Sequence, residues 1–439
     1  SAGADRTPDG PARVILRRVR SLASGGLAKD TGWALGAEAL TVVVLTVSFA
    51  LLGRRLGPEG YGAFVGMYGL LGPAISINQS AVGLAIYEHI VGRKESSADV
   101  AASCLSSTLF IGVVLSGAIV GLGTVLLPSL PLSLLILFAL GEMIVASVLM
   151  MSIAVVQSVR GFAAATRLRI LSTTFRGIAI VVLAVFDELT LRNLALGQMA
   201  AALVALVIVA RLVHRHVGRF VLPGPIRWDT MKTIGTYASG ISASSVQMSG
   251  DKVVLNTAGH VADAGLYGAA YRIIMMAQIP VNALVHSTHL SFLERDGTDP
   301  VRLCVKYSKI AFAYAAVAVI GLLVLAPLVP FVLGSDFDGT TNMIRWLTPV
   351  VLLSAITSFP ANGLLTYDRN GLRTKIVAAN AVFSLILYIV LIPPFSWRGA
   401  IAATVISEVT ITVTTWTALL FVSRQTRRQH VTASETVSV

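Results

Sequence analysis

The chain has 439 residues, of which 55% are hydrophobic and only 13% are charged, and its mean hydropathy is +0.78. Soluble domains carry about 25% charged residues, so this composition excludes an ordinary soluble protein and indicates a polytopic membrane protein. The formal net charge of +12 comes from basic residues spread over many short loops, which favours contact with anionic membrane lipids over nucleic acid binding.

The first 29 residues precede the first long apolar run and are rich in arginine. No apolar core of the signal-peptide type lies before Asp30, so we expect no cleavable signal peptide. Residues 12–24 mix apolar residues with four arginines, a pattern typical either of a short interfacial helix or of a solvated basic tail. Cys104 and Cys304 fall near the cytoplasmic ends of their predicted helices, where thiols stay reduced, and no disulfide is predicted.

Apolar runs long enough to cross a bilayer recur along the rest of the chain, and we count twelve. The predicted transmembrane helices are 30–53, 61–91, 100–127, 131–157, 167–186, 193–213, 233–258, 265–292, 303–333, 341–366, 374–394 and 399–423. Basic residues fill every second connecting loop, whereas the other loops contain few of them. This alternation places both termini in the cytoplasm.

Two short repeats divide the chain into halves. Tyr61-Gly62-Ala63 and Tyr267-Gly268-Ala269 each open a predicted helix, 206 residues apart, and Pro73 and Pro280 lie 207 residues apart. The repeats predict two six-helix lobes, related by an axis along the membrane normal, with a binding site between them. The predicted domains are a basic N-terminal segment 1–29, an N-lobe 30–213, a basic linker 214–232, a C-lobe 233–423 and a cytoplasmic tail 424–439.

The predicted helices 233–258 and 265–292 are the most polar of the twelve. Their polar residues form two stripes at helical spacing: Ser242, Ser245, Ser249, Lys252 and Asn256 on the first, and Tyr271, Met275, Gln278, Asn282, His286 and His289 on the second. Unpaired polar groups in hydrocarbon cost several kcal/mol each, so both stripes must face protein or a water-filled cavity. Serines alone could act only as contacts between helices, but charged residues at this depth favour a cavity.

Acidic residues within the predicted helices are few. Glu142 and Arg176 each lie near mid-span, so they either pair with each other or serve a cavity. Asp251 lies at nearly the same depth as Arg272 on the neighbouring helix, and we expect these two to pair, leaving Lys252 as the free cation. The alternative is that Asp251 and Lys252 satisfy other partners. A proton-coupled cycle would have to use some of the deep acids, and Glu38 is our first choice because the sequence offers it no partner.

The turn Leu56–Gly62, the Asp251-Lys252 pair and the Gly265–Arg272 run resemble the polysaccharide flippases of the MOP exporter superfamily, which include the Wzx-type O-antigen flippases. The resemblance covers nearly the whole chain, from Asp30 to Arg424. It implies an all-α fold in which two six-helix lobes form a V. It also implies flipping of an oligosaccharide on a polyprenyl pyrophosphate from the inner to the outer leaflet of the bacterial plasma membrane. Many members are described with fourteen spans, whereas this chain is predicted to have twelve.

Under this resemblance, four cations within predicted helices are candidate ligands for the anionic head group: Lys252, Arg272, Arg176 and Arg345. The candidate ligands for sugars are Asn78, Gln247, Asn256, Tyr271, Gln278 and Asn282. The candidate ion-coupling acids are Glu38, Asp251, Glu142 and Glu408. We expect no catalytic residue, no metal and no cofactor other than a coupling ion, H⁺ or Na⁺.

The expected partners are the lipid-linked oligosaccharide and membrane lipids, with a glycan polymerase and glycosyltransferases as candidate protein partners of a monomeric transporter. The main alternative is a MATE-like, proton- or sodium-coupled exporter of small cations, which Glu38 and Asp251 keep open. A membrane enzyme is disfavoured because no outer loop exceeds about ten residues and no metal-ligand or nucleophile motif is visible. A non-transporting scaffold would not need charged residues at membrane depth.

Overall fold

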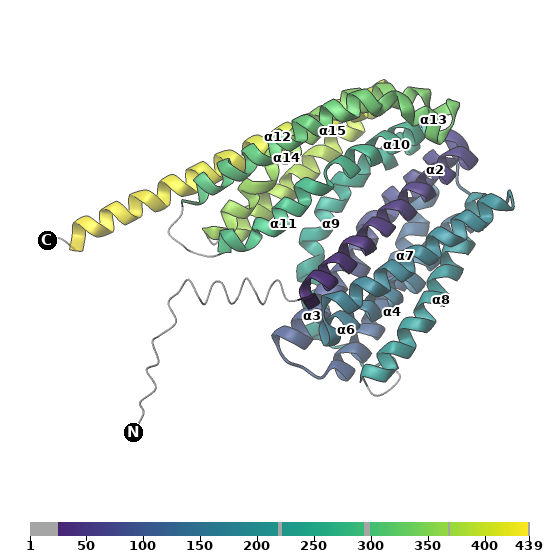
Figure 1. The fold of residues 1–439 in the computed structure, drawn as a ribbon, viewed down its shortest axis with the longest axis horizontal. Coiled ribbons are helices and arrows are strands. Elements are labelled where there is room, and N and C mark those ends of the chain that lie inside the picture. Colours follow the sequence, from purple (N-terminus) through teal and green to yellow (C-terminus); the bar gives the residue numbers. More distant parts are fainter. Residues whose placement is uncertain (1–24, 218–221, 294–298, 368, 438–439) are drawn as a thin grey trace.

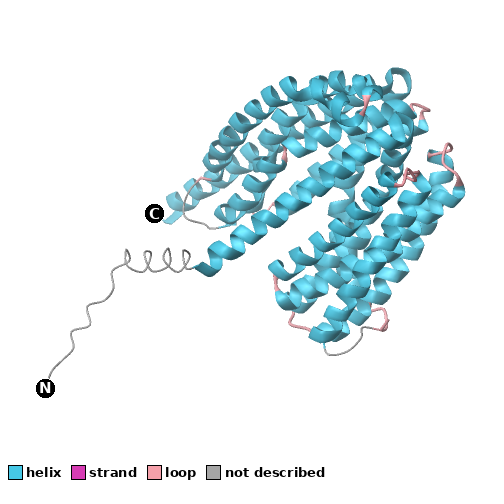
Figure 2. Cartoon of the chain, turned by 45° about the vertical axis from the view of Figure 1, so that its right-hand side comes forward, coloured by secondary structure: helices cyan, strands magenta, loops and turns pink. Residues whose placement is uncertain are grey.

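The computed structural model describes residues 25–217, 222–293, 299–367 and 369–437, and these residues are almost entirely helical (Figure 2). In chain order the helices are α2 (Gly25–Ile75), η1 (Ser76–Ala81), α3 (Val82–Tyr87), η2 (Glu88–Gly92), α4 (Ser97–Leu126), α5 (Leu132–Leu140), η3 (Gly141–Ala146), α6 (Ser147–Arg160), α7 (Phe162–Val185), α8 (Leu191–Val217), α9 (Trp228–Thr257), α10 (Val261–Ala277), α11 (Ile279–Leu293), α12 (Pro300–Leu325), η4 (Ala326–Leu328), α13 (Val329–Leu333), η5 (Ser335–Phe337), α14 (Asp338–Thr366) and α15 (Asn370–Val437). The segments η1, η2 and η3 are π-helical.

Eight helical stretches within the described residues are long and apolar enough to cross a membrane, or nine if the bent pair α10–α11 counts as one. Two of the eight each cover two of the twelve predicted spans, because α2 runs through a non-helical residue at Gly57 and α15 through one at Ser396. The α10–α11 pair bends by 43° beside Pro280, which lacks the N–H that would continue the helix. Helix α9 is 30 residues long but too polar to be among the eight.

The helices fall into two groups that diverge from one end of the molecule (Figure 1). Helices α3 to α8 form one group, which with α2 we call the N-lobe, and α10 to α15 form the other, which we call the C-lobe. Helix α9 contacts both groups, with α2 and η1 on one side and α15 on the other. The start of α2 and the end of α15 lie at the end where the groups diverge (Figure 1).

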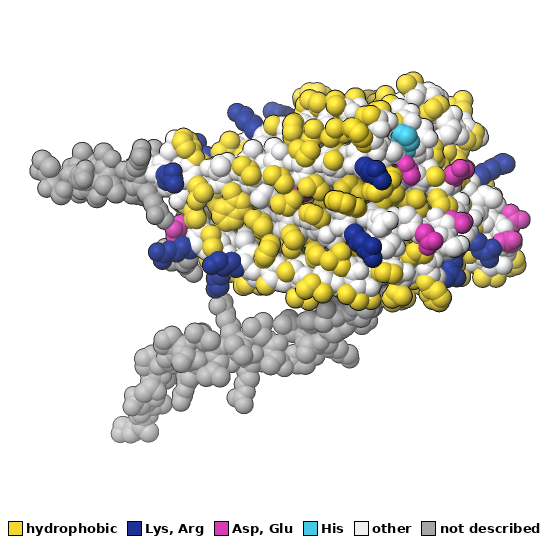
Figure 3. Space-filling view, turned by 90° about the horizontal axis from the view of Figure 1, so that it is seen from above, with side chains coloured by type: hydrophobic (Ala, Val, Ile, Leu, Met, Phe, Trp, Pro, Cys, Tyr) yellow, Lys and Arg dark blue, Asp and Glu magenta, His cyan; other side chains and the backbone are white. Residues whose placement is uncertain are grey.

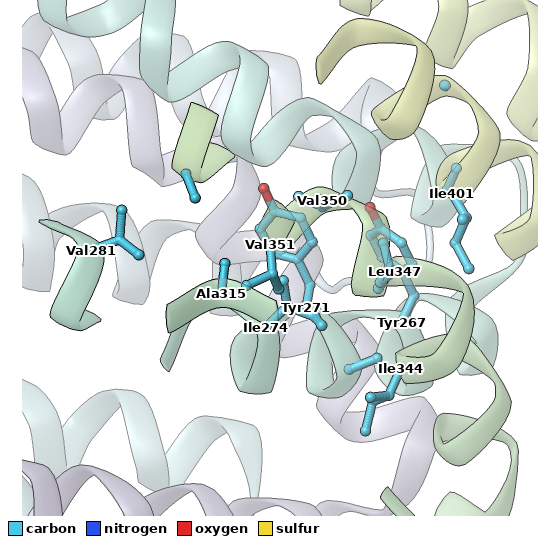
Figure 4. Close-up of a cluster of buried hydrophobic side chains, with 14 of the residues drawn as sticks. Tyr267, Tyr271, Ile274, Val281, Ala315, Ile344, Leu347, Val350, Val351 and Ile401 are labelled. Atoms are coloured by element: carbon cyan, nitrogen blue, oxygen red, sulfur yellow. The ribbon is translucent and has the colours of Figure 1, made fainter. Parts of the chain in front are cut away.

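Each lobe has its own apolar core. In the C-lobe, Tyr267, Ile274, Leu347 and Val351 belong to one buried cluster, in which Figure 4 shows the hydroxyls of Tyr267 and Tyr271 pointing the same way. Two clusters fill the N-lobe. A further cluster joins the lobes, since Phe49 and Tyr61 of α2 are buried together with Ala269 of α10 and Phe337 of η5. Burial of apolar surface therefore stabilises both the lobes and the contact between them.

The lobes meet at the converging end through glycine contacts. A Cβ atom on Gly62 would lie 1.9 Å from the Val261 carbonyl oxygen, and one on Gly265 would lie 2.0 Å from the Pro58 carbonyl oxygen. Only glycine allows the two backbones to approach this closely. Asn256 adds a hydrogen bond across the same contact, from its Nδ2 to the Gly62 carbonyl oxygen at 3.1 Å. The Tyr-Gly-Ala repeats therefore lie where α2 packs on α9 and α10.

The surface suits a lipid environment. Side chains such as Val125 and Phe331 are 71% and 81% exposed although they are apolar. On the face in Figure 3, hydrophobic side chains cover much of the surface, and most charged side chains gather toward its two ends. An apolar girdle between charged ends is the pattern expected of membrane-spanning helices.

Candidate substrate-binding pocket

A pocket of about 410 Å³ lies where α2, α7, α8, α9 and α10 meet. Three basic side chains line it, Arg176 from α7, Lys252 from α9 and Arg272 from α10, and none of the described residues that line it is acidic. The structure therefore brings three of the four predicted head-group cations into one place. We call this site the cationic pocket.

Arg176 forms an ion pair with a buried acid, Glu142. Its guanidinium lies 2.6 Å from Oε1 of Glu142, which also accepts a hydrogen bond of 2.9 Å from the Tyr68 hydroxyl. The Glu142 side chain is 5% exposed and that of Arg176 is 27% exposed, so the acid is hidden and the cation borders the pocket. The Glu142–Arg176 pair, one of the two alternatives that the sequence left open, is present.

Two π-helical segments, η1 and η3, support this pair from within the N-lobe. Asn78 donates from Nδ2 to the Met143 carbonyl oxygen at 2.8 Å, and Gln79 donates from Nε2 to the Glu142 carbonyl oxygen at 3.3 Å. Ser147 donates to the same Glu142 carbonyl oxygen at 2.9 Å. A π-helical turn holds one extra residue, which re-aims the backbone, and such turns are frequent at functional sites. Asn78 is fully buried in this contact, so the structure does not place it as a sugar ligand of the pocket.

Lys252 is paired with its chain neighbour. Its Nζ lies 2.8 Å from Oδ1 of Asp251 and 3.9 Å from the ring centroid of Tyr271, and it donates to the Met248 carbonyl oxygen at 2.8 Å. The Asp251 side chain is only 1% exposed and accepts a further hydrogen bond of 2.6 Å from the Tyr267 hydroxyl. The cation therefore reaches the pocket while its counter-charge is buried against Tyr267 of the C-lobe.

The expected pair of Asp251 with Arg272 is wrong. The two residues lie on adjacent helices at similar depth, but depth does not fix the direction in which each side chain points around its helix axis. Asp251 turns toward Tyr267, whose hydroxyl also lies 3.1 Å from Thr404 Oγ1 on α15. Arg272 turns the other way, and its guanidinium carbon lies 5.3 Å from the ring centroid of Phe49 on α2.

Arg272, rather than Lys252, is the pocket cation without an acidic partner in the described structure. Besides the Phe49 ring, it interacts with the hydroxyl of Tyr61, which also lines the pocket. Aromatic faces hold a guanidinium without neutralising its charge. Arg272 therefore presents a full positive charge to the pocket.

The remaining predicted ligands are scattered. Arg345 lies on the exposed face of α14 and does not line the cationic pocket. Among the predicted sugar ligands, Tyr271 lines the pocket, whereas Asn256 is buried in the contact between α2 and α9. Gln247 is half-buried, and its backbone carbonyl oxygen accepts a hydrogen bond of 3.1 Å from the Tyr388 hydroxyl.

Two more predicted ligands, Gln278 and Asn282, lie at the bend between α10 and α11 or just after it. Gln278 is buried at the bend and donates to Ser354 Oγ at 3.2 Å, and Ser354 lies 3.4 Å from the half-buried carboxylate of Glu408. Asn282 is exposed on α11. Glu38 belongs to α2, but its side chain lies outside the described residues.

The pocket also contains polar residues that the sequence analysis missed. Ser48, Thr173, Gln198 and Tyr68 line it together with the predicted Ser249. Nothing in the sequence singles out Tyr68, because Gly66 and Gly69 mark the face of α2 that meets α9, whereas Tyr68 points into the N-lobe toward Glu142.

Ion pairs outside the apolar spans join the start of α9 to the N-lobe. Arg93 lies 2.6 Å from Asp229 Oδ2, and Arg227 lies 2.6 Å from Glu95 Oε2. Burial raises the pKa of the Glu95 carboxyl, but its hydrogen bonds with His89 and Arg227 lower it by more. The pKa of Glu95 therefore lies below its ordinary value. Two ion pairs therefore connect the start of α9 to the N-lobe.

A family model described as polysaccharide biosynthesis protein matches residues 27–289. Comparison with curated protein sequences gives no match. One similar solved structure is an inward-facing multidrug resistance MATE family transporter of the MOP superfamily, with 16% identity over 88% of this chain and 96% of that chain and a TM-score of 0.69. Another is the lipid II flippase MurJ in an inward closed conformation, with 12% identity, 88% and 90% coverage and a TM-score of 0.68.

A third similar structure is a MOP superfamily transporter from Pyrococcus furiosus, with 15% identity over 88% of this chain and 93% of that chain and a TM-score of 0.60. At these identities the structural similarity establishes the fold, while the family model, which spans more than half of the chain, establishes the family. The chain belongs to the polysaccharide biosynthesis protein family, and its fold is that of the membrane transporters of the MOP superfamily.

Proposed function

We propose that the protein flips a polyprenyl-(pyro)phosphate-linked oligosaccharide from the inner to the outer leaflet of the bacterial plasma membrane by alternating access. The observation that carries this proposal is the cationic pocket, in which Arg176, Lys252 and Arg272 face one cavity and no described acidic residue lines it. A pyrophosphate needs charge-assisted donors from several directions, and these three residues come from three different helices.

Each cation has a different task in this proposal. Arg272 supplies the uncompensated charge and a planar fork that can bind a phosphate through two N–H groups. Lys252 can move between Asp251 and an incoming phosphate, because a flexible ammonium stem requires little rearrangement. Arg176 is held in place by Glu142 and contributes a donor whose orientation is fixed.

The arrangement of the lobes supports alternating access. The lobes converge through the Gly62 and Gly265 contacts and diverge at the opposite end, which would face the cytoplasm if both chain termini are cytoplasmic. During a transport cycle the lobes would close at the end where they now diverge and open at the end where they now converge. We expect H⁺ or Na⁺ to be the coupling ion.

Export of small cations, the alternative function, agrees less well with this pocket. The two acids nearest to it, Glu142 and Asp251, are buried and each already binds a cation of the protein. The Pyrococcus furiosus transporter is itself described as having a reversed polarity of its binding pocket that suggests a different function. The three cations that line the pocket of this chain favour an anionic cargo over a cationic one.

The test is binding to the purified protein in lipid nanodiscs. We expect citronellyl pyrophosphate, a short prenyl pyrophosphate, to bind, and Arg272→Gln to weaken binding about tenfold or more, because hydrogen bonds to charged groups contribute about 1.5–3 kcal/mol. Arg345→Gln, an exposed arginine outside the pocket, is the matched control and should have no effect. Tight binding of ethidium without binding of the pyrophosphate would instead favour cation export.

A further inference from the structure

A second cavity, of about 840 Å³, lies within the N-lobe between η1–α3, α6 and the start of α7. The polar part of its lining contains amides, hydroxyls, a phenol and a guanidinium: Gln79, Ser80, Tyr87, Gln157, Ser158 and Arg169. The rest of the lining is apolar or glycine: Gly83, Leu84, Val91, Met150, Ala154, Gly161 and Phe162. None of the described residues that line it is acidic. We call it the amide pocket. Its volume falls within the range of about 300–1,000 Å³ that is typical of small-molecule sites.

Two polar groups of the amide pocket are already used within the protein, since Gln79 donates to the Glu142 carbonyl oxygen and Ser158 to the Ala154 carbonyl oxygen, whereas Gln157 and Tyr87 keep groups that can meet a ligand. Gln157 accepts a hydrogen bond of 2.8 Å at Oε1 from Arg169, which leaves its NH₂ group with no partner recorded in the described structure. Tyr87 is 49% exposed, so its ring and hydroxyl face open space rather than the core. A Cβ atom on Gly161, which also lines the pocket, would meet nothing within 4 Å, so this wall of the pocket is open.

This chemistry selects a class of ligand. A cation would need acidic groups, which the described lining lacks. A purely apolar chain would match the apolar side chains of the lining but leave the Gln157 NH₂ group unpaired. A neutral ring that carries many hydroxyls can pair with amide donors and acceptors while its C–H face packs on a phenol ring. The amide pocket therefore fits a saccharide.

The amide pocket and the cationic pocket are connected through Glu142 and helix α7. Gln79 of the amide pocket donates to the Glu142 carbonyl oxygen, and the Glu142 carboxylate binds Arg176 of the cationic pocket. On α7, Arg169 and Arg176 lie seven residues apart, which is about 10 Å at about 1.5 Å per residue. One ligand can therefore reach from the first site to the second.

We propose that the amide pocket binds the first sugars of the lipid-linked oligosaccharide while the pyrophosphate occupies the cationic pocket. The proposal rests on the proposed function and adds a separate subsite, in which the Tyr87 ring stacks on a sugar and the Gln157 amide donates to its hydroxyls. The subsite lies farther along α3 and α7 toward the end where the lobes diverge. The glycan would thus be held on the N-lobe before the lobes exchange their positions.

The experiment compares two ligands that differ only in the sugar. Binding of citronellyl pyrophosphate and of a citronellyl-pyrophosphate-linked disaccharide is measured on the full-length protein in nanodiscs, with Tyr87→Ala, Tyr87→Phe and Gln157→Ala. Phe110→Ala, which removes an aromatic ring that is 53% exposed on α4 and lines neither pocket, is the matched control. Because Tyr87 is exposed, its truncation removes little core packing, and a thermal melt of each variant verifies folding.

We expect the wild type to bind the glycosylated ligand at least tenfold more tightly than the bare one. Tyr87→Ala and Gln157→Ala should remove most of this margin without changing the affinity for citronellyl pyrophosphate, and Tyr87→Phe should retain most of it. Equal affinity for the two ligands in the wild type, or variants that weaken both ligands alike, would overturn the subsite and leave the proposed function intact. Failure of the wild type to bind either ligand would overturn the proposed function and the subsite with it.

Discussion

Replacing Asp251 by Asn tests how charge is balanced behind the cationic pocket. The Asp251 carboxylate is 1% exposed and binds Lys252 Nζ at 2.8 Å, the Lys252 backbone N–H at 2.8 Å and the Tyr267 hydroxyl at 2.6 Å. An asparagine keeps the shape and one acceptor but removes the charge. We therefore expect lower stability and, because Lys252 loses its counter-charge, tighter binding of citronellyl pyrophosphate.

The magnitude follows from the burial of the pair. Removing one partner of a buried ion pair costs about 3–5 kcal/mol. Lys252 keeps the Met248 carbonyl oxygen and the Tyr271 ring in the variant, so its charge is not left without any partner and the loss should fall at the lower end of this range, about 3 kcal/mol.

The assay is a double-mutant cycle in chemical unfolding from mixed micelles. Asp251→Asn with Lys252→Met should show a coupling energy of about 2 kcal/mol, whereas Asp251→Asn with Arg272→Gln should be additive within about 0.5 kcal/mol. The Arg55–Asp187 pair, whose side chains are 43% and 80% exposed, is the control and should show about 0–1 kcal/mol. A larger coupling of Asp251 with Arg272 than with Lys252 would refute the assignment of the partners.

Three further outcomes are expected. Tyr68→Phe removes the hydrogen bond to Glu142 and should lower the free energy of unfolding by about 0.5–1.5 kcal/mol; no loss in chemical unfolding would mean that this bond is not formed in the membrane. Gly265→Ala should lower the thermal stability of the purified protein far more than Gly321→Ala, because a Cβ atom at 265 would lie 2.0 Å from the Pro58 carbonyl oxygen and one at 321 would meet nothing within 4 Å; equal melting temperatures would contradict the close approach. Glu38→Gln and Glu408→Gln should each reduce the response of transport in proteoliposomes to an imposed pH gradient, and a variant whose response is unchanged excludes its residue from coupling.

The gathering of cations could be predicted because it depends on the cost of charge in hydrocarbon. Arg176, Lys252 and Arg272 had to face protein or water, and three helices with such residues have few ways to do so. The Glu142–Arg176 pair follows from the same argument. Arg345 was expected in the same cavity, but it lies exposed in the first part of α14, seven residues after Asp338.

The partners of individual side chains could not be predicted in the same way. The depth of Asp251 and Arg272 can be counted along the sequence, but their directions depend on how α10 is turned against α9 and α15. The burial of Asn78 depends on η1 and η3, because an extra residue in each π-helical turn rotates the following side chains away from the spacing of an α-helix. The proline at 280 predicts a bend, but not that Gln278 would bind Ser354 there.

Helix α9 has a consequence for how the protein enters the membrane during synthesis. It is 30 residues long, yet the serines, Asp251, Lys252 and Asn256 make it too polar to pass as an apolar span. A charged residue at the centre of a helix opposes its transfer from the translocon into lipid by about 2.5–3.5 kcal/mol, and Asp251 and Lys252, which lie nearer the end of α9, add a part of this cost. The groups that satisfy α9 lie on α2, which is made earlier, on α10, which follows it directly, and on α15, which is made last. We therefore expect α9 to leave the translocon only in contact with α2, and to reach its final depth after α15 has been inserted.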